Sequence, residues 1–144
     1  MITLQVLRDL RACEEAQTAF ARYFPNGAPT WQAVAAHPAC QKEWKGWIAV
    51  RAPGLSFEDR LSLADQSDWP GLHLMVAVHA PGLSLGEREA LADQNDDPAY
   101  WRGWIAFRAP GLSFEERLSL ADKSDKPDYW RSWIKYRYIR ESKP

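Results

Sequence analysis

The chain has few cysteines, no long apolar run and almost no excess of charge. Cys13 and Cys40 lie in different segments, which argues against a disulfide scaffold and predicts a reduced, cytoplasmic protein. No apolar run approaches the roughly 18 residues that span a bilayer, and no apolar signal stretch opens the chain. The 18 Lys and Arg nearly balance the 19 Asp and Glu, so the formal charge of -1 attracts neither nucleic acid nor a membrane.

Tryptophan is abundant, with 8 residues in a chain of 144. The hydrophobic share of 46% and the charged share of 26% are those of a soluble globular protein. The length suits one domain, alone or with a helical appendage. The sequence therefore predicts a folded chain in which indole rings contribute much of the buried surface.

A repeat of 28 to 29 residues is the strongest signal in the chain. The string Ala-Pro-Gly-Leu-Ser occurs at Ala52–Ser56, Ala80–Ser84 and Ala109–Ser113. A fixed period in this range is typical of stacked-repeat architectures. The predicted organisation is an N-terminal helical cap, 1–43, and repeats at 44–71, 72–100 and 101–129 with a half-repeat at 130–144.

Each repeat is predicted to hold two short helices. Trp101, Trp104 and Ile105 share one face of the first helix with Arg108, because they fall at i, i+3, i+4 and i+7. The equivalent residues are Trp44, Trp47, Ile48 and Arg51, then Leu72, Met75, Val76 and His79, then Trp130, Trp133, Ile134 and Arg137. A second apolar stripe passes through Val50, Val78, Phe107 and Tyr136. A helix that is apolar on two sides is packed between neighbours.

Turn and cap residues mark the helix ends. Each Pro-Gly pair predicts a type II turn after the first helix, and an Asp-x-Pro sequence after each second helix predicts an Asp cap followed by Pro in the next first turn. Reciprocal caps are predicted for Ser56 with Asp59, Ser84 with Glu87 and Ser113 with Glu116. The predicted buried stripe of the second helix is Phe114, Leu118 and Ala121.

Residues 1–43 do not follow the period. Apolar residues at helical spacing predict one long helix from Thr3 to Phe24, and Pro25–Pro29 ends it. Thr30 is predicted to cap a short helix, Trp31–His37. This segment is either a terminal cap of the array or a separate functional element. The whole pattern predicts an all-α fold, a short α-solenoid of helix-hairpin repeats, because helices this short require packing to persist.

The N-terminal segment also resembles a group of known proteins. Ala12-Cys-Glu-Glu-Ala16, Phe20, Phe24-Pro-Asn-Gly27 and the helix at 31–36 are similar to the opening of many small phage and prophage proteins. The likeness covers about a quarter of the chain and implies a bacterial virus or mobile element acting in the bacterial host cytoplasm. The helix pairs resemble short HEAT-like repeats, a family of binding scaffolds, in architecture alone.

Metal, cofactor and catalytic signatures are not evident in the sequence. His37 and Cys40 form one local pair with Cys13 as a third candidate, whereas structural zinc needs four ligands at recognisable spacings. The recurrent serines have capping roles, and no glycine-rich phosphate loop follows a strand. We therefore expect no metal, no cofactor and no enzymatic activity.

Three surface features remain as candidates for binding. Arg51, His79, Arg108 and Arg137 are predicted to align along the array, as helix C-terminal cations, as cations stacked on a neighbouring Trp or as donors to an acidic partner. A row of aspartates along the turns caps helices, imitates a phosphate backbone or binds a basic protein surface, and it consists of Asp65, Asp68, Asp93, Asp96, Asp122 and Asp125. Residues 130–144 carry a net charge of +4 together with four aromatic residues, typical of a docking surface, a terminal cap or a dimer contact.

The function predicted from this pattern is protein binding without catalysis. The resemblance makes a phage-encoded inhibitor of a bacterial defence complex, of the anti-CRISPR type, the sharpest hypothesis, with a host protein or ribonucleoprotein complex as partner. Nucleic-acid binding through the basic aromatic C-terminus, or a structural, self-associating phage protein, is the alternative, and the chain is a monomer or dimer. The predicted contact residues are Arg51, Arg108, Trp130, Trp133, Tyr136, Arg137 and Arg140.

Overall fold

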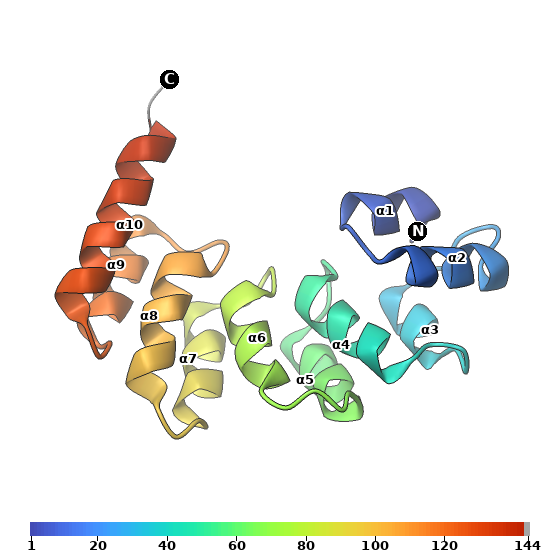
Figure 1. Ribbon diagram of the computed structural model, residues 1–144, viewed down its shortest axis with the longest axis horizontal. Coiled ribbons are helices and arrows are strands. Elements are labelled where there is room, and N and C mark those ends of the chain that lie inside the picture. The colour runs from blue at the N-terminus through green and yellow to red at the C-terminus, as the bar shows by residue number, and fades with distance from the viewer. Residues whose placement is uncertain (143–144) are drawn as a thin grey trace. The chain divides into compact units, whose positions relative to one another are not determined.

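The computed structural model describes residues 1–142, and the described chain forms ten α-helices (Figure 1). Its extended pairing is a single antiparallel bridge between Ile2 and Ala28. The all-α class is therefore confirmed, whereas the stacking of all repeats into one solenoid stays a prediction. The chain divides into two compact units, Met1–Pro70 and a second that begins at Gly71.

The first unit contains five helices, and the second unit contains five. In the first they are α1 (Leu4–Asp9), α2 (Glu14–Tyr23), α3 (Trp31–Ala36), α4 (Lys42–Arg51) and α5 (Phe57–Gln66). In the second they are α6 (Leu72–His79), α7 (Leu85–Asp93), α8 (Pro98–Arg108), α9 (Phe114–Asp122) and α10 (Pro127–Ser142). Each of the three full repeats contains two short helices on either side of its Pro-Gly turn, as the pattern predicts.

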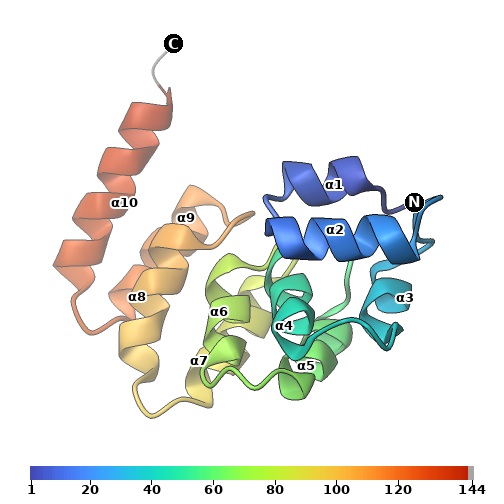
Figure 2. The same cartoon turned by 45° about the vertical axis from the view of Figure 1, so that its right-hand side comes forward.

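The prediction of one long helix from Thr3 to Phe24 is wrong. The chain turns between α1 and α2, which lie side by side (Figure 2). Arg11 adopts φ +60°, its N–H donates to Arg8 O at 2.9 Å, and the Ala12 N–H donates to Leu7 O at 2.9 Å. These two bonds form the Schellman arrangement that ends a helix. The turn lets both helices bury their apolar faces, since Leu7 and Phe20 are each buried.

The predicted short helix after Thr30 is confirmed. The Thr30 side chain accepts a hydrogen bond from Ala33 N at 3.1 Å, and the helix ends at Ala36. The three Pro-Gly turns also form as predicted, with Gly54, Gly82 and Gly111 at φ +78° to +80°. A residue with a β-carbon rarely adopts this left-handed conformation, which explains why glycine occupies each turn.

Two of the three reciprocal caps are confirmed. Ser84 with Glu87 and Ser113 with Glu116 exchange both hydrogen bonds. Ser56 accepts from Asp59 N at 3.1 Å, but the reciprocal bond predicted for Asp59 is absent from its cap. The aspartate side chain is one methylene shorter than glutamate. Its Oδ2 instead accepts a hydrogen bond from Gln32 Nε2 at 2.9 Å.

The Asp-x-Pro caps form differently from the prediction. Asp97, rather than Asp96, accepts a hydrogen bond from Tyr100 N at the start of α8, and Pro98 is the first helical residue. The start of α6 follows Gly71 at φ +78° instead of an aspartate cap. Asp68 pairs there with Lys42 at 3.4 Å.

A recurrent arginine on the second helix braces each helix pair. Nη1 of Arg60, Arg88 and Arg117 donates to the carbonyl oxygen 11 residues earlier, at Ala49, Ala77 and Ala106, over 2.9 to 3.0 Å. These carbonyls lie in the last turn of the first helix, where intrahelical donors run out. Arg60 and Arg88 are 0% exposed. In the predicted stripe, Phe114 and Leu118 are only half-buried. Arg117 and Leu120 instead occupy the face of α9 that packs against the first helix of the repeat.

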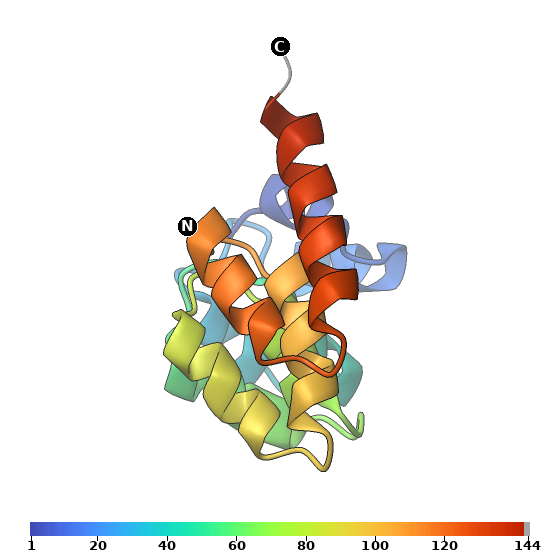
Figure 3. The same ribbon diagram turned by 90° about the vertical axis from the view of Figure 1, so that its left-hand side faces the viewer.

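The second unit is built by successive packing of first helices. α8 contacts α6 and α7 on one side and α9 and α10 on the other, and Figure 3 shows α10 beside α8 and α9. Gly103 of α8 lets α10 pack closely against α8, since a β-carbon there would lie 2.1 Å from Trp130 Nε1. The Trp130 ring also packs on Trp104, with ring centroids 5.0 Å apart.

Candidate functional site

The predicted contact residues fall in both units. Arg51 is exposed at the end of α4 in the first unit, whereas the other six belong to the second unit. Arg108 is exposed at the end of α8, with its guanidinium carbon 5.2 Å from the centre of the Phe107 ring. The alignment of the arginines into one row along the array stays a prediction.

One face of α10 brings together three of the predicted residues. Tyr129, Trp133, Tyr136 and Arg140 are spaced i, i+4, i+7 and i+11, and therefore lie along one side of the helix. The three aromatic side chains are 46% to 57% exposed. Ring centroids are 6.5 Å apart for Tyr129 and Trp133 and 6.1 Å apart for Trp133 and Tyr136. We call these four residues the aromatic face. Tyr129 was missed, although its position one turn before Trp133 marks it.

Trp130 does not belong to this surface. It is 5% exposed and packs against Trp104 and Phe107 of α8. The expectation that it contacts a partner is therefore corrected, because its position in the helix turns the indole toward α8. Its role is to fix α10 in place beneath the aromatic face.

Arg137 is anchored within the second unit. Its Nη1 donates to Phe107 O at 2.5 Å, and its Nε donates to Glu141 Oε1 at 2.9 Å. The side chain is about a third exposed. Arg137 can therefore touch a ligand only with the part of its guanidinium that these bonds leave accessible.

The sequence of α10 differs from that of the preceding first helices on its outer side. Lys135 stands where the other repeats have Ala49, Ala77 and Ala106, which are all 0% exposed. Tyr138, 52% exposed, replaces the fully buried Ala109. Ile139-Arg140 replaces Pro110-Gly111, so α10 continues through the position where α8 ends. The buried small residues of α8 thus correspond to exposed long side chains on α10.

Charges around α10 are only partly paired. Arg131 bonds to Asp122 at 2.7 Å, as Arg102 bonds to Asp93 at 2.5 Å in the preceding repeat. These pairs occupy part of the aspartate row. Within residues 1–142, Lys135 and Arg140 form no ion pair. Arg140 of the aromatic face and Lys135 of the same helix are therefore exposed cations without an ion pair in the described chain.

A cavity of about 260 Å³ lies between α9 and α10. Its lining combines two arginines and one carboxylate with aromatic and aliphatic side chains. The residues are Phe107, Leu112, Phe114, Arg117, Ile134, Arg137, Tyr138 and Glu141. We call it the arginine cavity. The Tyr138 ring forms part of its wall by stacking on Phe114, with centroids 4.4 Å apart.

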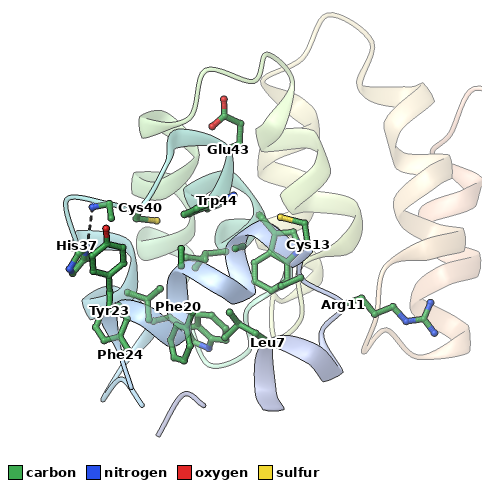
Figure 4. Close-up of a pocket in the computed structure, with 18 residues that line it drawn as sticks. Leu7, Arg11, Cys13, Phe20, Tyr23, Phe24, His37, Cys40, Glu43 and Trp44 are labelled. Carbon is green, nitrogen blue, oxygen red and sulfur yellow. Dashed lines mark hydrogen bonds between the residues drawn. The ribbon is translucent and has the colours of Figure 1, made fainter. Parts of the chain in front are cut away.

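The first unit has a larger, mainly apolar and partly open cavity of about 370 Å³, lined by residues of α1 to α4 and of the segments between them (Figure 4). Cys13 and Cys40 both line it, and burial raises the pKa of the Cys40 thiol. That thiol is consequently protonated and weakly nucleophilic near neutral pH. His37 Nδ1 accepts a hydrogen bond from Ala39 N at 3.0 Å, and its ring packs against Tyr23.

No family model, curated protein or solved structure matches the chain in the comparisons with known proteins. In residues 1–142, no helix is both long and apolar enough to cross a bilayer. The same residues contain no cluster of three or more His, Cys, Asp or Glu side chains arranged to hold a metal ion.

Proposed function

We propose that the chain is a non-catalytic protein-binding module and that its aromatic face docks on an acidic surface of a partner protein. The observation that carries the proposal is the row of exposed Tyr129, Trp133 and Tyr136 side chains ending in Arg140. Tyr, Trp and Arg are the residues most enriched at binding hot spots. Lys135 and Arg140 supply charge complementarity to carboxylates on the partner.

A protein partner accounts for this surface better than nucleic acid. The rings of Trp133 and Tyr136 meet at 88°, and those of Tyr129 and Trp133 at 68°, so each covers part of its neighbour. Binding of single-stranded nucleic acid uses ring faces open to successive bases, in a positively charged groove. The nearby carboxylates of Asp128 and Glu141 also weaken the positive field that a phosphate backbone requires.

A second copy of the chain is a weaker candidate for this face. In a twofold dimer the same patch would meet itself. A second copy would bring the same exposed cations, Lys135 and Arg140, to this face, and like charges oppose association. An acidic partner avoids this cost.

The aromatic face is tested by a double substitution with a matched control. Trp133→Ala/Tyr136→Ala is expected to weaken partner binding at least tenfold, because truncating a hot-spot aromatic side chain costs about 2 kcal/mol or more. The control, Tyr23→Ala/Trp69→Ala, removes an exposed Tyr and an exposed Trp from the first unit and leaves binding unchanged. The measurement is quantitative affinity purification from nuclease-treated bacterial lysate, with folding checked by circular dichroism.

Three results would contradict this assignment. Retention of the same partners by the Trp133→Ala/Tyr136→Ala variant would remove the aromatic face as the contact. Binding that occurs in untreated lysate and disappears in nuclease-treated lysate would identify nucleic acid as the ligand. Recovery of the chain's own copies alone, with a concentration-dependent mass in light scattering, would identify self-association.

The biological setting that we propose is inhibition of a bacterial defence complex by a phage-encoded protein. Its support is the resemblance of residues 12–36 to phage and prophage proteins, together with a surface suited to binding. Expression in a bacterium with an active CRISPR system is expected to restore plaque formation by a targeted phage. The Trp133→Ala/Tyr136→Ala variant should fail to restore it. Equal plaque counts with and without the wild-type chain would contradict this setting.

A further inference from the structure

Arg117 has fewer hydrogen-bond partners than its equivalent in the preceding repeat. Arg88 donates through Nη2 to Ala80 O at 2.7 Å and to Pro110 O at 3.1 Å, in addition to its brace to Ala77. Within the described residues, Arg117 makes only the brace, to Ala106 O. Neither the counterpart of the Ala80 bond, to Ala109 O, nor a bond to the next repeat is formed in the part of the chain that the structure describes, and the sequence of α10 explains the second difference. Ile139 stands at the position of Pro110, and its backbone belongs to a helix instead of a turn with an accessible carbonyl.

Arg117 lines the arginine cavity, where positive charge exceeds negative charge. Arg117 and Arg137 line it together with one carboxylate, Glu141, which is already bonded to Arg137. Burial lowers the pKa of Arg117, and the nearby Arg137 lowers it further. Both effects disfavour the charged guanidinium, and an additional anion would offset them.

The rest of the lining is apolar. Phe107, Leu112, Phe114 and Ile134 surround the arginines together with the ring of Tyr138. A bare inorganic anion would leave this surface unfilled. A carboxylate on an aliphatic or aromatic stem would place its charge at the guanidinium and its stem against the rings. Arg is well suited to such a ligand, since its planar fork binds both carboxylate oxygens.

We infer that the arginine cavity binds a carboxylate on an apolar stem, presented by the acidic partner protein, and that Arg117 is its principal donor. The inference rests on the proposed function for the source of the carboxylate. The incoming group takes the place that the Pro110 carbonyl holds at Arg88, and Glu141 competes with it for Arg137. The cavity would then select partners that carry such a carboxylate, in addition to the contacts of the aromatic face.

A small probe tests the cavity independently of the partner. Sodium 3-phenylpropionate is titrated into the full chain, and the Nε–H resonances of Arg117 and Arg137 are followed by NMR. We expect saturable shifts with the carboxylate and none with the neutral 3-phenylpropanamide. Arg117→Gln should weaken binding at least about tenfold, since charge-assisted bonds are the strong ones. Glu141→Gln should strengthen it about two- to fivefold by removing an exposed competing charge.

Two further variants separate the outcomes. Arg117→Lys keeps the charge without the fork and is expected to bind weakly, and the Glu141→Gln result does not depend on whether Arg117 variants fold. Trp133→Ala/Tyr136→Ala should leave probe binding unchanged, because neither residue lines the cavity. Equal shifts with acid and amide, or no gain in Glu141→Gln, would overturn the inference. If Trp133→Ala/Tyr136→Ala loses partner binding while Arg117→Gln keeps it, the proposed function would stand and the inference about the arginine cavity would fail.

Discussion

Replacing Arg88 with alanine is expected to lower the free energy of unfolding of the second unit by about 3–5 kcal/mol. Arg88 is 0% exposed and donates to the carbonyls of Ala77, Ala80 and Pro110. Alanine removes these donors and leaves buried carbonyls without them, and each such loss costs about 1–3 kcal/mol. The substitution also leaves a cavity where α7 meets the C-terminal end of α6 and the turn that contains Pro110.

Arg108→Ala is the matched control, because Arg108 is exposed at a helix end. Its expected cost is about 0.3–1 kcal/mol, the usual value of a cation near a helix C-terminus. Urea unfolding followed by circular dichroism measures both variants. A shared midpoint for Arg88→Ala and Arg108→Ala would show that the buried arginine does not brace the helix pair.

Replacing Trp130 with alanine is expected to destabilise the second unit by about 3–5 kcal/mol, the usual range for a buried aromatic residue. The indole fills the space that Gly103 leaves on α8 and packs against Trp104 and Phe107. These contacts are the main aromatic attachment of α10 to α8. Their loss should loosen α10 and, through it, the aromatic face.

Trp133→Ala is the comparison, since Trp133 lies three residues further along the same helix and is 46% exposed. Its expected cost is below about 1 kcal/mol, because nearly half of its surface is already in contact with water. We therefore expect Trp130→Ala to lower the stability of the second unit and Trp133→Ala to weaken partner binding. Equal urea midpoints for the two variants would contradict the packing described here.

Local signals in the sequence predicted the helices of the repeats well. Pro-Gly pairs and Ser caps act on neighbouring residues alone, so they fix helix ends whatever the tertiary context. The left-handed Arg11 shows the limit of this reasoning. Glycine usually marks that conformation, and the arginine there gave no indication that the predicted N-terminal helix divides in two.

The buried arginines were missed for a different reason. Hydrophobic patterning treats arginine as a surface residue, although Arg60, Arg88 and Arg117 each follow the capping serine by four residues. Their recurrence at that position was visible and was the available signal. Only packing against the preceding helix shows that carbonyls at its end require a long donor.

The candidate surface was predictable in part. Trp133, Tyr136 and Arg140 were predicted and lie on one exposed face, while Trp130 was assigned to the same surface although it is buried. Helical spacing had placed Trp130 and Trp133 on one face, and only the packing of Trp130 against α8 shows that the first is buried and the second exposed. The arginine cavity depends on contacts between α9 and α10, which no local pattern encodes.

Site-specific cross-linking tests the central claim most directly. Benzoylphenylalanine is placed at position 136 on the aromatic face, or at exposed position 119 on α9 as the control, and cells are irradiated before mass spectrometry. The account predicts a covalent adduct at position 136 with a protein whose linked segment is acidic, and none at position 119. The same adducts at both positions, or adducts at position 136 with nucleic acid alone, would contradict it.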